Sequence, residues 1–382
     1  MKESNLNRRQ FAQTVGAVIG GAALLPGLAV TPAEARQHSP RSSDGAIEID
    51  SNENPYGPSP RARDAITNSE NIACRYPDAT EGKMVDAIAK FHQVAADQVA
   101  LGCGSTEILR MADTAFVGPT KNVVVAQPTY EAVLNFAKAL HANPVLVPST
   151  SDHRHDLPAM AAATTAGTGL VYICNPNNPT GTIVTLDELS KFMDRVPKTT
   201  TVLVDEAYYH FAEDPAYGSV IDWIPKYPNL VVARTFSKIY GMAGMRLGYA
   251  LSTPANIRAM RSSKLMFNAN EAVMNAAIVS LNDPDHVADQ RQKINGTKKW
   301  LCAELDKDGR RYIPSQTNFM MINVGGDVTP VIRAFAEKNI LVGRKFATLE
   351  NWMRVSMGTP DEMQKFTAAL REIVPAGKAM AS

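Results

Sequence analysis

Four short apolar runs dominate the middle of the chain. They are residues 123–126, 170–173, 202–204 and 230–233, and segments of helical length separate them. Runs this short and this uniformly apolar are typical of strands buried on both faces, and the intervening helices indicate βαβ units. The pattern predicts an α/β domain over residues 78–270, with a mainly parallel sheet between helices.

The pattern changes towards both ends of the chain. Long helical patterns surround two strand-like segments, residues 318–324 and 352–356, and predict a smaller C-terminal α+β domain over residues 271–382. Residues 48–60 are rich in turn-forming residues and predict an extended arm without regular structure. We therefore assign residues 47–77 to an N-terminal arm and part of the small domain.

The first 35 residues have the pattern of an export signal. Arg8 and Arg9 precede an apolar, Gly/Ala-rich stretch over residues 15–30, and Ala33 and Ala35 provide a small-x-small cleavage pattern. This arrangement resembles a twin-arginine signal peptide, which predicts a periplasmic or secreted protein exported in the folded state. An ordinary amphipathic helix and a retained membrane anchor are the alternatives. The polar residues 36–46 are expected to form a linker.

Composition excludes several function classes. The chain has 382 residues, 45% of them hydrophobic, and 39 basic side chains balance 38 acidic ones. This is enough apolar surface for a large folded core, and the balanced charge gives no reason to expect nucleic acid or an anionic membrane as partner. The four cysteines are scattered, so we expect neither a disulfide nor a metal site, and Cys103 and Cys174 are interpreted as small buried thiols.

Three short motifs carry the candidate chemistry. Residues 175–181 read Asn-Pro-Asn-Asn-Pro-Thr-Gly, residues 205–208 read Asp-Glu-Ala-Tyr, and Ser237-Lys238 precedes Arg246 by eight positions. Each has a structural alternative when taken alone, namely a turn, a helix N-cap and a surface lysine. Their order and spacing together resemble class I/II pyridoxal-phosphate aminotransferases of fold type I, and within them the histidinol-phosphate aminotransferase group, over residues 47–370.

The resemblance implies a cofactor, pyridoxal 5′-phosphate, and a role for each motif residue. Lys238 is implied to form a Schiff base with the cofactor and later to act as the base that moves the substrate proton. Asp205 would keep the pyridine nitrogen protonated. Tyr208 and Asn178 would share the phenolic oxygen, and Tyr130 would stack on the ring, with a buried core tyrosine as its alternative.

Phosphate binding requires backbone amides at a helix start, hydroxyl groups and a fixed cation. Residues 101–104 precede a helical pattern whose first amides belong to Ser105 and Thr106, although a Gly-x-Gly is often only a turn. The resemblance adds the hydroxyls of Thr235 and Ser237 and the guanidinium of Arg246. The position of Thr106 is often acidic in the family, so this chain departs from the pattern there.

On the substrate side, the resemblance implies that Arg354 binds the acidic group of the substrate, carboxylate or phosphate. Tyr56 and Asn318 would line the same pocket, with Tyr56 on the arm. Arg344 lies near the place of a second phosphate-binding arginine, and an ordinary surface cation is its alternative. Tyr76 would reach the cofactor phosphate of a neighbouring subunit, which implies a homodimer.

These observations predict transfer of an amino group from an amino acid, or an amino-phosphate such as histidinol phosphate, to a 2-oxo acid. A free amino acid is favoured, because residues 266–270 depart from the family pattern and because histidine biosynthesis is cytoplasmic, whereas the first 35 residues predict export. A decarboxylase, a lyase or an oxidase could use the same pocket. A non-catalytic binding module is the alternative from another class, but such a module would typically have lost Lys238.

Overall fold

The computed structural model describes residues 45–375. The predicted signal peptide and residues 36–44 of the predicted linker lie outside the described residues. In the described part of the chain, no helix is long and apolar enough to cross a membrane.

A seven-stranded sheet forms the centre of the fold. Across the sheet the strands are β2 (Val99–Gly102), β8 (Gly248–Leu251), β7 (Leu230–Thr235), β6 (Thr201–Asp205), β5 (Thr168–Cys174), β3 (Asn122–Gln127) and β4 (Val145–Pro148). Strand β8 runs antiparallel to both of its neighbours, and the other pairs are parallel. The four strands predicted from apolar runs are confirmed, as is the mainly parallel α/β sheet.

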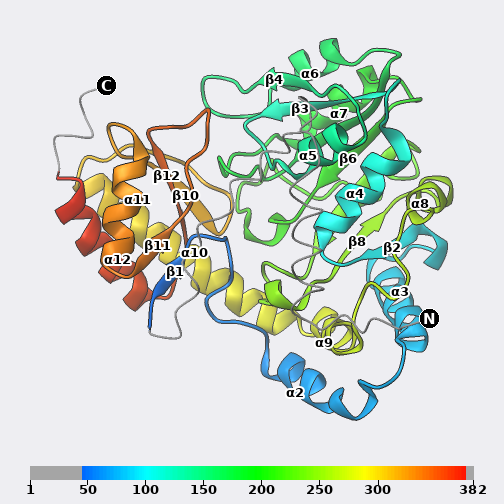
Figure 1. Ribbon diagram of the computed structural model, residues 1–382, viewed down its shortest axis with the longest axis horizontal. Helices are drawn as coiled ribbons and strands as arrows, with labels where there is room; N and C mark the ends of the chain where they lie inside the picture. The colour runs from blue at the N-terminus through cyan, green and yellow to red at the C-terminus, as the bar shows by residue number, and fades with distance from the viewer. Residues whose placement is uncertain (1–44, 376–382) are drawn as a thin grey trace, which may run out of the picture. The chain divides into compact units, whose positions relative to one another are not determined.

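Helices cover both faces of this sheet (Figure 1). They are α3 (Asp78–His92), α4 (Ser105–Phe116), α5 (Ala132–Ala139), α6 (Leu157–Ala163), α7 (Leu186–Arg195), α8 (Pro254–Arg261) and α9 (Glu271–Leu281), and α2 (Pro60–Asn68) packs on α9. Successive strand residues point to opposite faces, so Val123 and Val125 join the core under α4, α5 and α8, whereas Val124 joins the core that includes α6 and α7.

A second, smaller sheet has the order β12 (Trp352–Ser356), β10 (Phe319–Asn323) and β9 (Tyr312–Ile313), all antiparallel. Figure 1 shows the long helix α10 (Pro284–Lys307) leading to this sheet, with α11 (Val328–Glu337) and α12 (Pro360–Ile373) beside it. The predicted α+β character is confirmed. The domain boundaries stay predictions, since the chain from Ala46 onward forms one compact unit.

The predicted arm is partly regular, which corrects the expectation of no secondary structure over residues 48–60. β1 (Ile47–Ile49) pairs in parallel with β11 (Ile340–Val342), and Ile49 is buried. The pairing gives hydrogen-bond partners to backbone N–H and C=O groups of the arm, and the local sequence does not show where such partners lie. Short 3₁₀ turns complete the fold: η1 (Glu70–Ile72), η2 (Ala96–Gln98), η3 (Tyr209–Phe211), η4 (Ile221–Trp223) and η5 (Ala243–Met245).

Candidate active site

The candidate residues gather at one edge of the large sheet. The parallel strands end there, and the segments that follow β2, β3, β5, β6 and β7 carry Ser105, Tyr130, Asn178, Tyr208 and Lys238. In open α/β sheets, ligands bind outside the carboxyl ends of the strands. The sheet topology therefore brings together side chains from five separate segments of the sequence.

Lys238 is partly buried behind the N-terminal arm. Its Nζ donates to the carbonyl oxygens of Asn52, at 3.0 Å, and Ser51, at 3.4 Å. Burial lowers the pKa of Lys238 to about 8, and the nearby guanidinium groups of Arg354 and Arg246 act in the same direction. An amine with this pKa has a substantial neutral fraction near physiological pH, as a nucleophilic lysine requires.

Asp205 is the last residue of β6 and is held from two sides. Its Oδ2 accepts from the Tyr172 hydroxyl at 3.0 Å, and its Oδ1 accepts from the Ala207 amide at 3.0 Å. Burial raises the pKa of Asp205 to about 6, while the hydrogen bond from Tyr172 acts to lower it. Sequence reasoning did not identify Tyr172 as a site residue. The hydroxyl of this tyrosine, in the otherwise aliphatic run of residues 170–173, was the feature that could have indicated it.

Asn178 connects the predicted cofactor residues with the predicted substrate residue. Its Nδ2 donates to the Tyr208 hydroxyl at 3.4 Å, and its Oδ1 accepts from Arg354 at 2.8 Å. The same Tyr208 hydroxyl accepts from Nδ2 of Asn52 at 3.1 Å, a further residue that sequence reasoning missed. Asn178 thus uses both ends of its amide, one on Tyr208 and one on Arg354.

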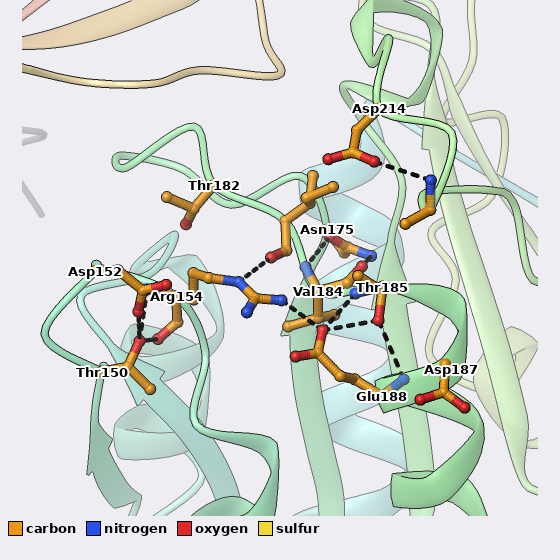
Figure 2. A network of polar contacts seen from close by, with 12 residues as sticks. Thr150, Asp152, Arg154, Asn175, Thr182, Val184, Thr185, Asp187, Glu188 and Asp214 are labelled. Carbon is orange, nitrogen blue, oxygen red and sulfur yellow. Dashed lines mark hydrogen bonds and ion pairs between the residues drawn. The ribbon is translucent and has the colours of Figure 1, made fainter.

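The loop that carries Asn178 is fixed from behind by the network in Figure 2. Arg154 donates to the Ile183 carbonyl at 2.8 Å and forms an ion pair with Glu188, which also closes the capping box of α7 with Thr185. Asn175 exchanges two hydrogen bonds of 3.0 Å with the backbone of Val184. These contacts hold both ends of the turn, so Asn178 is presented on a rigid segment.

A cation lies beside the amino end of α4. A Cβ atom on Gly104 would lie 2.2 Å from a terminal nitrogen of Arg246, and one on Gly248 would lie 2.3 Å from the Ser105 amide nitrogen. The guanidinium therefore approaches the first turn of α4 closely, and Arg246 adopts a left-handed φ of 64°. A positive charge beside the positive end of a helix dipole is unfavourable alone, whereas an anion between them would be stabilised by both.

Hydroxyl groups surround the same point. The Thr235 hydroxyl donates to that of Ser237 at 2.9 Å, and Arg246 lies 3.5 Å from the same Ser237 oxygen. Thr106 and Tyr130 hydroxyls lie 3.4 Å apart at the start of α4. The predicted phosphate-binding residues and the predicted stacking residue are thus brought together.

The residues present fit pyridoxal 5′-phosphate. The paired cation and helix start suit its phosphate, buried Asp205 suits its pyridine nitrogen, and the amine of Lys238 suits its aldehyde. Tyr208 and Asn178, whose side chains lie 3.4 Å apart, suit the phenolic oxygen of its ring.

The other predicted site residues lie farther out or on the arm. Asn318 is buried and its amide donates to the carbonyl oxygens of Asn52 and Glu53, at 3.0 and 3.2 Å, which ties the arm to β10. Tyr56 packs against the ammonium group of Lys293 on α10, 5.3 Å from its ring centroid. Its predicted closure over the pocket stays a prediction.

Tyr76 and Arg344 lie at the surface of this chain. Tyr76 is 76% exposed and stacks on Phe267 with a centroid distance of 4.6 Å, so it does not reach the site of its own chain. Arg344 forms an ion pair with Glu131 at 2.5 Å. Its side chain also packs on Phe346, whose ring centroid is 4.4 Å from the guanidinium carbon.

The cysteines partly correct the sequence interpretation. Cys174 is buried, as predicted, and burial raises the pKa of its thiol. Cys103 is exposed, contrary to the prediction, because it precedes Gly104 in the connection to α4 instead of lying in the sheet. In the described residues the four cysteines are free, and no group of three or more His, Cys, Asp or Glu side chains could hold a metal.

The fold and this site define a pyridoxal-phosphate enzyme of the aminotransferase type. The family model for aminotransferases of class I and II matches residues 45–370, and the chain belongs to that family. The chain is 36% identical over 331 residues to histidinol-phosphate aminotransferase of Moorella thermoacetica, covering 86% of this chain and 85% of that protein. It is also 36% identical to the enzyme of that name from Brevibacillus brevis, over 86% of this chain and 90% of the relative.

A solved structure gives the cofactor. Histidinol-phosphate aminotransferase from Sinorhizobium meliloti in complex with pyridoxal 5′-phosphate has a TM-score of 0.81 and 29% identity, and it covers 86% of this chain and 90% of its own. The predicted fold type, cofactor and enzyme class are confirmed. This protein is a pyridoxal-phosphate-dependent aminotransferase.

Proposed function

We propose that this aminotransferase takes the amino group from a free amino acid and passes it to a 2-oxo acid, with the carboxylate of each substrate on Arg354. One arrangement supports this proposal above all. Arg354 is hydrogen-bonded to Asn178 and is also the charge that most lowers the pKa of Lys238. The charge of an anion-binding group thus acts on the amine of Lys238, as expected of a site for a small substrate that carries both an amine and an acid.

In this proposal each residue has one task. Bound pyridoxal phosphate supplies a ring that accepts electrons from the substrate Cα. Lys238 Nζ would take the proton from the substrate Cα and deliver it to C4′ of the cofactor, which its lowered pKa permits. The Asp205 carboxylate would accept a hydrogen bond from the ring nitrogen, and Tyr208 would donate one to the ring oxygen.

Binding of the cofactor phosphate is assigned to the start of α4 and its surroundings. The amides of Ser105 and Thr106 would donate to phosphate oxygens, and Arg246 would supply the opposite charge. The hydroxyls of Thr235 and Ser237 complete the shell. Because these groups bind away from the reacting carbon, they orient the ring without taking part in proton transfer.

Histidinol phosphate is the second candidate donor. The names of the relatives from Moorella thermoacetica and Brevibacillus brevis favour it, and a guanidinium binds phosphate as well as carboxylate. The free amino acid is preferred because residues 266–270 differ from the family pattern and because an export signal would separate the protein from a cytoplasmic pathway.

A donor panel tests the proposal. The purified protein, loaded with pyridoxal phosphate, is incubated with 2-oxoglutarate or pyruvate and each common amino acid, with histidinol phosphate in parallel. We expect an oxo acid from the donor and an aminated acceptor in equal amounts. Transfer from histidinol phosphate alone would select the second candidate, and carbon dioxide, or ammonia with peroxide, would indicate decarboxylation or oxidation.

The role of Lys238 has a separate test with an internal control. Borohydride reduction followed by peptide mapping should place the cofactor on Lys238. The matched control is Lys298, a buried lysine whose pKa burial also lowers to about 8 and whose Nζ donates to the Thr317 carbonyl at 2.9 Å. Labelling of Lys298, or equal labelling after Lys238→Ala, would contradict the assignment.

We also propose that the active unit is a homodimer. Large apolar side chains are exposed together around Tyr76, with Leu265 63% and Met266 80% exposed beside the stacked Phe267. A second copy would cover this cluster and receive Tyr76 near its cofactor phosphate. Sedimentation should give a dimer, and Met266→Lys should shift it to monomer; an unchanged monomer in both cases would refute the proposal.

Export by the twin-arginine route is proposed from the sequence alone. The cofactor must be captured during folding, and this route carries folded proteins, so the signal and the site are consistent. Cell fractionation should find the protein outside the cytoplasm, and the double change Arg8→Lys with Arg9→Lys should retain it inside. Equal distribution of both forms would contradict export by this route.

A further inference from the structure

Asn52, a buried residue of the N-terminal arm, contacts the candidate active site with both its backbone and its side chain. It is 2% exposed and has a left-handed φ of 56°, a conformation that asparagine adopts more readily than most residues. It precedes Tyr208 by 156 positions and Lys238 by 186, yet it is hydrogen-bonded to both. The fold therefore places one arm residue against two residues of the site.

The side-chain amide of Asn52 is oriented by Ser356 on β12. The Ser356 hydroxyl accepts from the Asn52 backbone N–H at 2.8 Å and donates to the side-chain Oδ1 at 3.3 Å. Because Oδ1 is the acceptor in this contact, Nδ2 is the atom that faces Tyr208, and it donates to the Tyr208 hydroxyl oxygen at 3.1 Å. The contact with Ser356 thus fixes the direction of the hydrogen bond to Tyr208.

A second amide donates to the same Tyr208 oxygen. Arg354 can only donate, so its bond to Oδ1 of Asn178 directs Nδ2 of Asn178 towards Tyr208, at 3.4 Å. With two donors on it, the Tyr208 oxygen has used its accepting capacity, and its own O–H remains to donate. Burial raises the pKa of Tyr208 and the hydrogen bond from Asn52 acts to lower it, which makes the hydroxyl a stronger donor.

The backbone of Asn52 has a separate contact with the reactive amine. Its carbonyl oxygen accepts from Lys238 Nζ and from Nδ2 of Asn318, both at 3.0 Å. Glycine at this position would keep the carbonyl and adopt the same φ, and it would lose only the side-chain amide. One substitution can therefore separate the two contributions of Asn52.

We propose that Asn52 is a positioning residue whose side-chain amide aims the Tyr208 proton at the ring oxygen of the bound cofactor. This inference rests on the proposed function, in which Tyr208 donates to that oxygen. A donated hydrogen bond stabilises the anionic form of the ring oxygen. Without the amide of Asn52, the Tyr208 oxygen gains a free acceptor site, and its proton is less strongly directed towards the ring.

A pH titration of the absorption of the bound cofactor tests this without turnover. The visible absorption of the holoenzyme changes with ionisation at the ring, and its midpoint pH is measured for the natural protein and for Asn52→Gly. We expect the midpoint to rise by about half to one pH unit, the range of one hydrogen bond. Asn52→Asp keeps the shape of the side chain, but its carboxylate would accept the Tyr208 proton, so the midpoint should rise at least as far.

Two control variants separate this effect from a general change in the arm. Asn339 is exposed and has a φ of 59°, so Asn339→Gly repeats the same backbone change away from the site. Gln290 on α10 accepts from Nδ2 of Asn54 at 3.2 Å, so Gln290→Ala weakens the attachment of the arm without touching Tyr208. Both variants should keep the midpoint of the natural protein, and urea unfolding reports any loss of stability separately.

The double variant shows whether Asn52 acts through Tyr208. Tyr208→Phe should raise the midpoint, and adding Asn52→Gly should have no further effect. An unchanged midpoint in Asn52→Gly, in Asn52→Asp or in Tyr208→Phe would overturn the inference. So would an equal rise in Gln290→Ala, or an effect of Asn52→Gly that persists without the Tyr208 hydroxyl. Failure of amino transfer is a separate result, because it would appear in the donor panel, whereas this titration needs no amino donor.

Discussion

The hydroxyl of Tyr172 donates to Oδ2 of Asp205 at 3.0 Å, entirely within the core of the large sheet. The two residues lie on adjacent parallel strands, β5 and β6, and both side chains are buried. The bond stabilises the ionised form of a carboxyl group whose pKa burial raises to about 6. It therefore counteracts the cost of keeping a charge at the place assigned to the cofactor nitrogen.

The first prediction concerns this bond. Tyr172→Phe removes the hydroxyl and keeps the ring, so the pKa of Asp205 should rise further. Hydrogen bonds to charged groups contribute about 1.5–3 kcal/mol, which corresponds to roughly one to two pKa units. We expect the acidic limb of the kcat/KM profile to move up by about one pH unit and the Kd for pyridoxal phosphate to increase.

The control is another buried tyrosine with a carboxylate partner. Tyr227 donates to Asp194 at 2.7 Å, away from the site, so Tyr227→Phe should leave the acidic limb in place. Identical profiles for both variants would mean that the bond to Tyr172 has no influence on Asp205.

Sequence patterns predicted the strands well, because local apolar runs encode them, and the turn motifs supplied the candidate site residues. They could not show which side chains pair across the fold. Asp205 and Glu206 are adjacent, yet one bonds to Tyr172 and the other to Arg234 on β7. Which of two neighbouring carboxylates faces a ligand depends on strand pairing, which a local pattern does not specify.

Long-range contacts explain the remaining differences. The strand β1 forms its backbone pairing with β11, which lies almost 300 residues later in the chain. The turn-rich composition of residues 48–60 therefore did not predict this strand. Cys103 resembled a buried thiol by its neighbours, but its position outside the strand exposes it. Gly343 has a packing reason that no local pattern shows, because a Cβ atom there would lie 3.0 Å from the Arg354 Cβ.

A second prediction concerns the approach of Arg246 to α4. Gly104→Ala places a methyl group at the position now 2.2 Å from the guanidinium and at a φ of 76°. The left-handed backbone alone costs a non-glycine residue about 1–2 kcal/mol. We expect the Kd for pyridoxal phosphate, from absorbance titration of the apoprotein, to increase at least about tenfold.

Gly244→Ala is the matched control in the loop that carries Arg246. A Cβ atom at Gly244 has no neighbour within 4 Å, so its Kd should stay near that of the natural protein. Equal Kd values for the two alanine variants would show that the close approach at Gly104 does not matter for the cofactor.

A third prediction concerns the buried ion pair behind Asp205. Arg234 donates twice to Glu206, at 2.8 and 3.0 Å, and once to the Ser219 hydroxyl at 2.8 Å. Glu206→Gln leaves the buried guanidinium without its opposite charge, and breaking such a pair costs about 3–5 kcal/mol. Urea unfolding should report this loss, whereas Asp187→Asn, which removes an exposed pair with Lys191, should change stability by less than about 1 kcal/mol. Similar losses in both variants would contradict the prediction.

The fourth prediction concerns Asp113, a fully buried residue of α4 whose two carboxylate oxygens have no hydrogen-bond partner in the described structure. Burial raises its pKa to about 8. The folded state therefore keeps the proton between about pH 4 and 8, where the unfolded chain releases it, so this group makes the free energy of unfolding fall as pH rises. Its contribution is about 1.4 kcal/mol per pH unit.

Asp113→Asn removes the titration, so the stability of the variant relative to the natural protein should increase from pH 5 to pH 7 by roughly 2–3 kcal/mol. Urea unfolding at the two pH values measures this, with the exposed Asp64→Asn as control, and a constant difference across the range would exclude an effect of Asp113 ionisation.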